Sequence, residues 1–145
     1  MSNYYSDKSN QIIQHSKKQL NDLLKLVVDI HYTTFQQTVI YSKMQNFINP
    51  FNYKEQRILE KEIHSHFALL THCLRQQCPS LTKKELLICC LSFRFPMRII
   101  GLCLGYTSTN NIRQHKMRIK KKMINSDNSI LFDCIFFKKE DNVTL

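Results

Sequence analysis

The 145-residue sequence contains few glycine, proline and acidic residues and no tryptophan. Tight β-hairpins depend on glycine and on Asn-Gly or Asp-Gly pairs, but the chain has two glycines and neither pair. No apolar run approaches the ~18 residues that cross a membrane, and the polar start MSNYYSDKSN lacks the apolar centre of a signal peptide. These absences predict an all-α protein that resides in the cytoplasm and does not enter a membrane.

Features typical of enzymes and metal proteins are also missing. The sequence has no glycine-rich phosphate loop, no Walker motif and no paired-carboxylate pattern. The six cysteines form no paired C-x-x-C framework, and Cys89-Cys90 lies in an apolar run that indicates core packing. His64 and His66 would point about 200° apart on a helix, so they cannot hold one ion from one face. We therefore expect no catalytic residues, no cofactor and no metal.

Positive charge is concentrated in one segment. Ten of the 21 lysine and arginine residues lie between Leu81 and Met123, where Glu85 is the one acidic residue, so this segment carries most of the net charge of +10. Such a charge favours a polyanionic partner, with nucleic acid as the first expectation and an anionic membrane surface as the second. Apolar residues recur at helical spacing within the same segment, which places the charge on predicted helices.

The first half of the chain is predicted to form long helices. Residues 1–9 are polar and without periodicity, and we expect them to be disordered. Residues 10–78 show broad apolar stripes that predict two helices, from about 10 to 47 and from about 52 to 77, divided by Asn49-Pro50 and ended by Cys78-Pro79. Either a hairpin within one chain or coiled-coil-like pairing with a second copy fits these stripes. We interpret 10–78 as a stalk or dimerisation region.

Residues 79–139 have the pattern of a helix-turn-helix domain, followed by a frayed tail over 140–145. The sequence T-K-K-E at 82–85 predicts a capping box before an apolar helix. Pro96 then begins a short apolar helix, and Gly105 provides a helix stop and turn. A basic helix follows over 108–123, capped by Thr107 or Ser108, and its inward face is predicted to carry Ile112, His115, Ile119 and Met123.

The predicted outward face of the helix 108–123 carries side chains of the kinds that recognise DNA in the major groove. Arginine, lysine, asparagine and glutamine read base edges, while lysine, arginine and backbone N–H groups bind phosphates. The predicted DNA-binding residues are Thr107, Ser108, Thr109, Asn110, Asn111, Arg113, Gln114, Lys116, Met117, Arg118, Lys120 and Lys121. Further phosphate contacts are expected from Lys83, Lys84, Arg94, Arg98 and Lys122.

The segment 81–123 resembles the LuxR/GerE-type helix-turn-helix, in the form found at the C-terminus of bacterial regulators that carry tetratricopeptide repeats. The matching residues are Leu81-Thr82, Glu85-Leu86, Cys89-Cys90-Leu91, Ile100, Leu104-Gly105, Ser108, Ile112, His115, Arg118-Ile119 and Lys122-Met123. The resemblance implies a four-helix DNA-binding domain of the winged-helix-like superfamily whose recognition helix spans Ser108–Met123. The chain departs from the family at Phe95–Gly101, which is one residue shorter and lacks the usual glutamate.

Two functional hypotheses follow. The first is a sequence-specific regulator of transcription that binds double-stranded DNA as a homodimer, located with the nucleoid in the cytoplasm. The second is a helical adaptor whose basic helix docks on an acidic protein partner, such as RNA polymerase or another regulator. Binding of RNA ranks lower, because Tyr106 is the one aromatic residue within the basic segment that suits base stacking.

Overall fold

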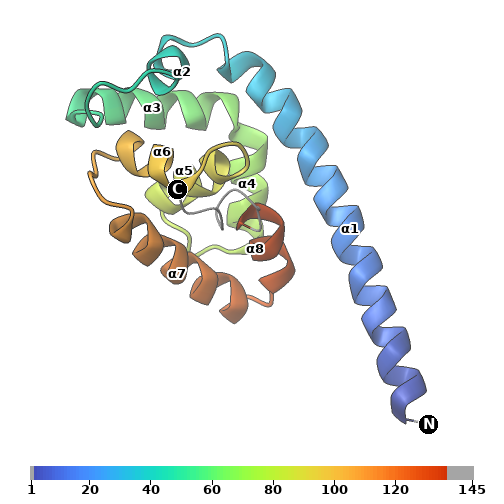
Figure 1. Cartoon of the computed structure of the whole chain (residues 1–145). Helices are drawn as coiled ribbons and strands as arrows, with labels where there is room; N and C mark the ends of the chain where they lie inside the picture. Colours follow the sequence, from blue (N-terminus) through green and yellow to red (C-terminus); the bar gives the residue numbers. More distant parts are fainter. Residues whose placement is uncertain (1, 137–145) are drawn as a thin grey trace.

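The computed structural model describes the backbone of residues 2–136 and the side chains of Gln11 and residues 15–136. Within this range the structure is helical and contains no strand, which confirms the all-α prediction. The tail 140–145 and the last residues of the predicted 79–139 domain lie outside the described residues. The helices, shown in Figure 1, are α1 (Ser2–Phe35), α2 (Val39–Met44), α3 (Tyr53–His66), α4 (Ala68–Gln77), α5 (Lys83–Ser92), α6 (Met97–Cys103), α7 (Asn110–Asn125) and α8 (Ser129–Phe136).

The first predicted helix differs from the observed one at both ends. α1 begins at Ser2, ahead of the helix start predicted near residue 10; the segment contains no glycine or proline that would interrupt helical hydrogen bonding. α1 ends at Phe35 instead of continuing to 47, because Thr38 adopts an extended backbone and begins a new helix. The Thr38 hydroxyl donates to the Phe35 carbonyl over 2.8 Å and accepts from the Tyr41 N–H over 3.2 Å.

Tertiary packing divides the second predicted helix into α3 and α4. Phe67 is completely buried, and its φ of −110° and ψ of 26° interrupt the helix. Its ring contacts Tyr32 and Phe35 of α1 at centroid separations of 4.8 and 5.6 Å. α3 itself begins with a capping box formed by Asn52 and Glu55, a feature that was not predicted.

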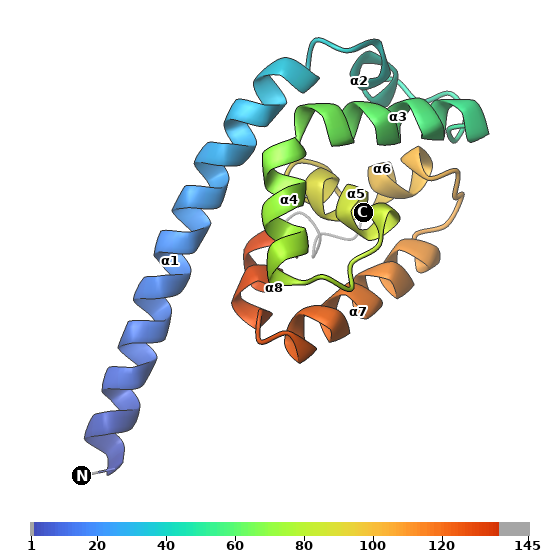
Figure 2. The ribbon, with the colours of Figure 1, turned by 180° about the vertical axis from the view of Figure 1, so that it is seen from behind.

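A single hydrophobic core joins the two regions that were predicted to be separate. α5 lies at its centre, with every residue from Glu85 to Ser92 buried, and α3 and α4 both pack against it. The C-terminal part of α1 also reaches α5, where the Tyr32 hydroxyl donates to the Cys90 carbonyl over 2.8 Å. The predicted boundary at 78/79 therefore does not separate two cores, and only the first half of α1 projects from the body (Figures 1 and 2).

Candidate nucleic-acid interface

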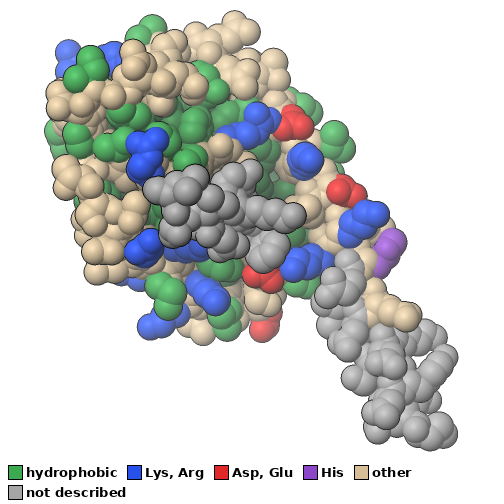
Figure 3. All heavy atoms as spheres, in the orientation of Figure 1, with side chains coloured by type: hydrophobic (Ala, Val, Ile, Leu, Met, Phe, Trp, Pro, Cys, Tyr) green, Lys and Arg blue, Asp and Glu red, His purple; other side chains and the backbone are tan. Residues whose placement is uncertain are grey.

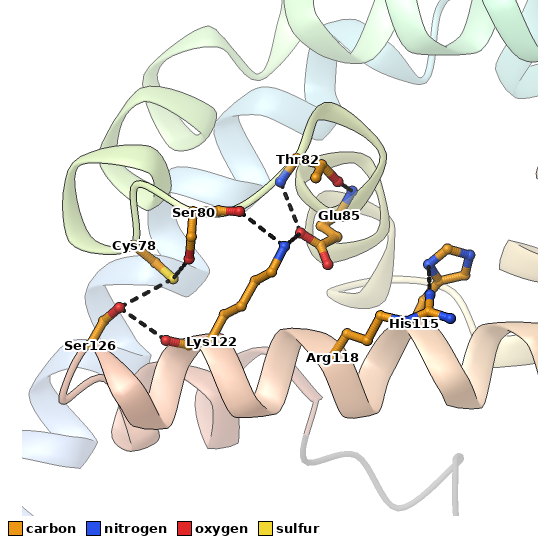
Figure 4. Close-up of polar contacts among 8 residues, drawn as sticks. All are labelled: Cys78, Ser80, Thr82, Glu85, His115, Arg118, Lys122 and Ser126. Atoms are coloured by element: carbon orange, nitrogen blue, oxygen red, sulfur yellow. Dashed lines mark hydrogen bonds and ion pairs between the residues drawn. The ribbon is translucent and has the colours of Figure 1, made fainter.

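The N-terminus of α5 is fixed by the predicted capping box and by a contact from α7. The Thr82 hydroxyl accepts from the Glu85 N–H over 3.1 Å, and the Glu85 carboxylate accepts from the Thr82 N–H over 2.9 Å. Lys122 Nζ lies 2.5 Å from Glu85 Oε1 and 3.0 Å from the Ser80 carbonyl oxygen (Figure 4). The expectation that Lys122 contacts phosphate is therefore corrected: its ammonium group ties α7 to α5.

This network changes the acidity of Glu85. Burial disfavours the charged carboxylate, but the hydrogen bonds from Lys122 and Thr82 outweigh that effect and lower the pKa of Glu85. The carboxylate is thus ionised at neutral pH and has a cationic partner, which satisfies its charge within the protein.

The turn before α7 is held by the chain segment that precedes α3. Gly105 adopts a left-handed φ of 82°, and the Tyr106 N–H donates to the Gly101 carbonyl over 2.8 Å. The Phe51 N–H donates to the Leu102 carbonyl over 2.9 Å, and Gln56 Nε2 donates to the Phe51 carbonyl over 2.9 Å. A Cβ atom on Gly105 would lie 3.2 Å from the Phe51 carbonyl oxygen, and together with the left-handed φ this close approach favours glycine.

α7 begins and ends two residues later than predicted. Its N-cap is Thr109, whose side chain makes no capping hydrogen bond, in place of the predicted Thr107 or Ser108. The Ser108 hydroxyl still contributes to this end of the helix, because it accepts from the Asn110 N–H over 3.2 Å. Asn110 and the residues that follow it therefore occupy the first turn of α7.

The inward face of α7 agrees with the sequence prediction. Ile112, Ile119 and Met123 are buried, and His115 is half-buried at the edge of this face. His115 Nε2 lies 3.2 Å from the Tyr106 hydroxyl, and its Nδ1 lies 3.4 Å from Arg118 Nη1 (the latter contact is drawn in Figure 4). Burial lowers the pKa of His115, and the positive charges of Arg118 and Lys84 lower it further.

The outward side of α7 is exposed and basic. Of the twelve predicted DNA-binding residues, Thr109 and Lys116 are half-buried and the other ten are exposed. Opposite the buried side chains, at helical spacing, lie the residues that we call the reading face: Asn110, Arg113, Gln114, Met117 and Lys121. Arginine and lysine side chains gather along the lower edge of the molecule in Figure 3, where α7 lies in Figure 1.

The remaining predicted cations have three different surroundings. Lys116 and Lys120 turn towards α8, where their Nζ atoms lie 5.5 and 5.7 Å from the ring centroids of Phe136 and Phe132. Arg94 forms an ion pair with Asp29 of α1 and lies over the Tyr32 ring, which corrects its predicted role in phosphate binding. The other predicted cations away from α7, which are Lys83, Lys84 and Arg98, are exposed.

Outside α7, the described structure contains cavities but no cluster of metal-ligating side chains. Among the residues that it covers, no three His, Cys, Asp or Glu side chains lie close enough to hold a metal ion. Two cavities of about 470 and 390 Å³ lie away from the reading face, one beside the α2–α3 loop and one between α1, α4 and α8. None of the described helices has both the length and the apolar character needed to cross a bilayer.

Comparison with known proteins adds no relationship to this geometry. The chain matches no protein-family model, and neither curated proteins nor solved structures give a significant match.

Proposed function

We propose that the protein is a sequence-specific regulator of transcription that binds double-stranded DNA as a dimer and acts in the bacterial cytoplasm with the nucleoid. α5 to α8 serve as a LuxR/GerE-type helix-turn-helix domain in this proposal, and α7 is the helix that enters the major groove. The observation that supports it best is the division of α7 into a buried face, Ile112, Ile119 and Met123, and an exposed face of basic and amide side chains.

Binding would proceed through two kinds of contact. Lys84, Arg118 and Lys121 are exposed on α5 and α7, where they can contact phosphates and set the position of the domain on the duplex. The first two turns of α7 present Asn110, Arg113 and Gln114, whose paired donors and acceptors match base edges in the major groove. The internal contacts of Glu85 and Gly105 hold α7 in position while it binds.

Selection of bound duplexes from a random pool, followed by footprinting, tests this function directly. We expect a two-fold symmetric sequence whose half-sites lie about one helical turn apart. Equal recovery of all sequences at low salt, or no binding at all, would contradict the proposal.

Matched variants separate base reading from phosphate binding. Arg113→Ala and Gln114→Ala should each cost about 1–3 kcal/mol at the selected site and relax the preference there. Lys121→Ala should weaken binding to selected and random duplexes equally. It should also reduce the slope of the logarithm of the binding constant against the logarithm of salt concentration by about one. Equal losses on both kinds of duplex for all three variants would argue against groove reading.

A protein adaptor is the second candidate, and an exposed apolar face on α1 favours it. Leu23, Leu26 and Ile30 are all exposed large hydrophobic residues. In this role the basic helix α7 would bind an acidic surface of RNA polymerase or of another regulator. Stable assembly with such a protein, together with no binding to any duplex at low salt, would favour the adaptor over the regulator.

A further inference from the structure

α1 carries apolar side chains on two different faces. Val28, Tyr32 and Phe35 are buried against the body of the protein. On another side of the same helix, Leu23, Leu26 and Ile30 follow each other at helical spacing and remain 59%, 64% and 68% exposed. Three exposed large residues in one row form an apolar ridge. The solvent-facing side of a surface helix is normally polar, so such a ridge indicates an interaction surface.

The ridge is not the result of a loosely attached helix. The Tyr32 hydroxyl binds the Cys90 carbonyl inside the core, and Asp29 pairs with Arg94 next to it. Further towards the N-terminus, Lys17 Nζ lies 3.6 Å from Asp133 of α8. These contacts fix the rotation of α1, so Leu23, Leu26 and Ile30 cannot turn inwards without breaking them.

An apolar groove runs beside the ridge. It has a volume of about 390 Å³ and lies where α1 faces α4 and α8. Leu69 of α4 is exposed on its wall, and deeper positions are occupied by Leu70 and Leu74. The same copy therefore presents a ridge and, next to it, a groove of similar character. A two-fold interface uses the same surface of both copies, and a ridge next to a groove can make such a surface complementary to itself.

Charge also favours a second copy over a partner of opposite charge at this surface. The border of the ridge that lies away from the groove carries Lys18, Asp22, Lys25 and Asp29, two positive and two negative side chains. The excess positive charge of the protein lies mostly between residues 81 and 123. Two copies can thus approach through α1 with balanced local charge, which they cannot do through α7.

We infer that this ridge and groove form the dimer interface, with α1 of each copy packed antiparallel against α1 and α4 of the other. The inference deepens the proposed function, since it identifies the surface through which the DNA-binding dimer assembles. At 1.5 Å per residue α1 is about 51 Å long, which provides the length for the ~800 Å² per partner of a stable interface. α8 lies between α1 and α7 in Figure 1, so the reading face stays open.

Sedimentation equilibrium of the full chain at micromolar concentration tests the interface. Wild-type protein should have twice the chain mass of 17.3 kDa. The double variant Leu26→Glu/Ile30→Glu should sediment at the mass of one chain, since it places two carboxylates on the ridge. Leu69→Glu, on the groove wall, should independently give the same loss. Ile48→Glu is the matched control, because Ile48 is 88% exposed on the distant α2–α3 loop, and it should leave the dimer intact.

The inference is overturned if the wild type is a monomer, if both ridge and groove variants remain dimers, or if Ile48→Glu dissociates the protein equally. Circular dichroism identifies any variant that has lost its fold. If the ridge variant or the groove variant is unfolded, the mass of the other one tests the interface. Binding to a duplex with a single half-site separates this result from the proposed function. If a monomeric variant keeps the wild-type base preference on that duplex, its substitution disrupts dimerisation and leaves recognition of bases in the major groove unchanged.

Discussion

Met117 is an apolar residue at the centre of a polar surface. Its side chain is 57% exposed between Arg113, Gln114 and Lys121 on the reading face. Nothing within the chain covers it among the described residues, whereas Met123 on the opposite side of α7 is fully buried. The major groove offers an apolar group of suitable size, the 5-methyl group of thymine, which distinguishes A·T from G·C pairs.

We expect Met117 to contact a thymine methyl in the selected DNA sequence. Replacing that thymine by deoxyuridine removes one methyl group and should weaken wild-type binding by about 0.8 kcal/mol, or about fourfold. Met117→Ala should bind the thymine and deoxyuridine duplexes equally in a titration. Ile124→Ala, which changes another exposed apolar residue at the end of α7, should keep the fourfold difference. Discrimination that survives in Met117→Ala would assign the methyl contact elsewhere.

The two glycines allow the turn before α7 to be tested with opposite expectations. Gly105→Ala forces a left-handed conformation on a residue with a side chain and places Cβ against Gln56 and the Phe51 carbonyl, which should cost at least about 1–2 kcal/mol of unfolding free energy. Gly101→Ala meets its nearest neighbour, Ile112 Cγ1, at an ordinary 3.5 Å and should stabilise α6 by about 0.5–1 kcal/mol. Urea unfolding measures both; changes of the same sign would contradict this account of the turn.

Glu85 makes the contact between α5 and α7 dependent on pH. Because its pKa is lowered in the folded protein, its contribution is complete above the ordinary value of 4.5 and disappears as pH falls through the folded value. Glu85→Gln should therefore reduce the free energy of unfolding by about 1.5–3 kcal/mol at neutral pH, and by progressively less below pH 4.5. Asp133→Asn removes an exposed ion pair and should change stability by less than about 1 kcal/mol. A loss in Glu85→Gln that is constant from neutral to acid pH would refute this linkage.

The elements that were predictable from sequence are those with local chemical signals. T-K-K-E at residues 82–85, Pro96 and Gly105 each act within one or two turns, and the structure has a helix start or stop at each. The break at Phe67 has no such signal, because it results from the packing of that ring against α1. The pairing of Lys122 with Glu85 was likewise missed, since it joins residues that are distant in sequence. Helical spacing places Lys122 beside His115 and Ile119 and apart from exposed Lys121, but it does not identify the partner of Lys122 on α5.

At the scale of the whole molecule, the shared core predicts that the DNA-binding helices do not fold alone. A fragment of residues 79–145 lacks α3 and α4, which cover α5, and would expose much of the apolar surface of that helix. We expect this fragment to show no cooperative thermal transition by circular dichroism, while the full chain unfolds in one step.

A fragment of residues 17–145 provides the control for that experiment. It removes only the projecting part of α1 and keeps Lys17, Val28, Tyr32 and Phe35, so it should retain a cooperative transition close to that of the full chain. A folded 79–145 fragment would instead restore the predicted boundary between two independent domains.

The cysteines buried in the core can be used to measure how often the native structure unfolds. Cys78, Cys89, Cys90 and Cys103 are buried, and burial raises the thiol pKa of the last three, whereas Cys73 is exposed. Alkylating reagents attack the thiolate form of an accessible cysteine. At neutral pH Cys73 of the native chain should thus be alkylated first. Each buried cysteine should be alkylated only after the structure around it unfolds. The rate of that slow labelling, followed by mass spectrometry, records how often the helices around α5 separate.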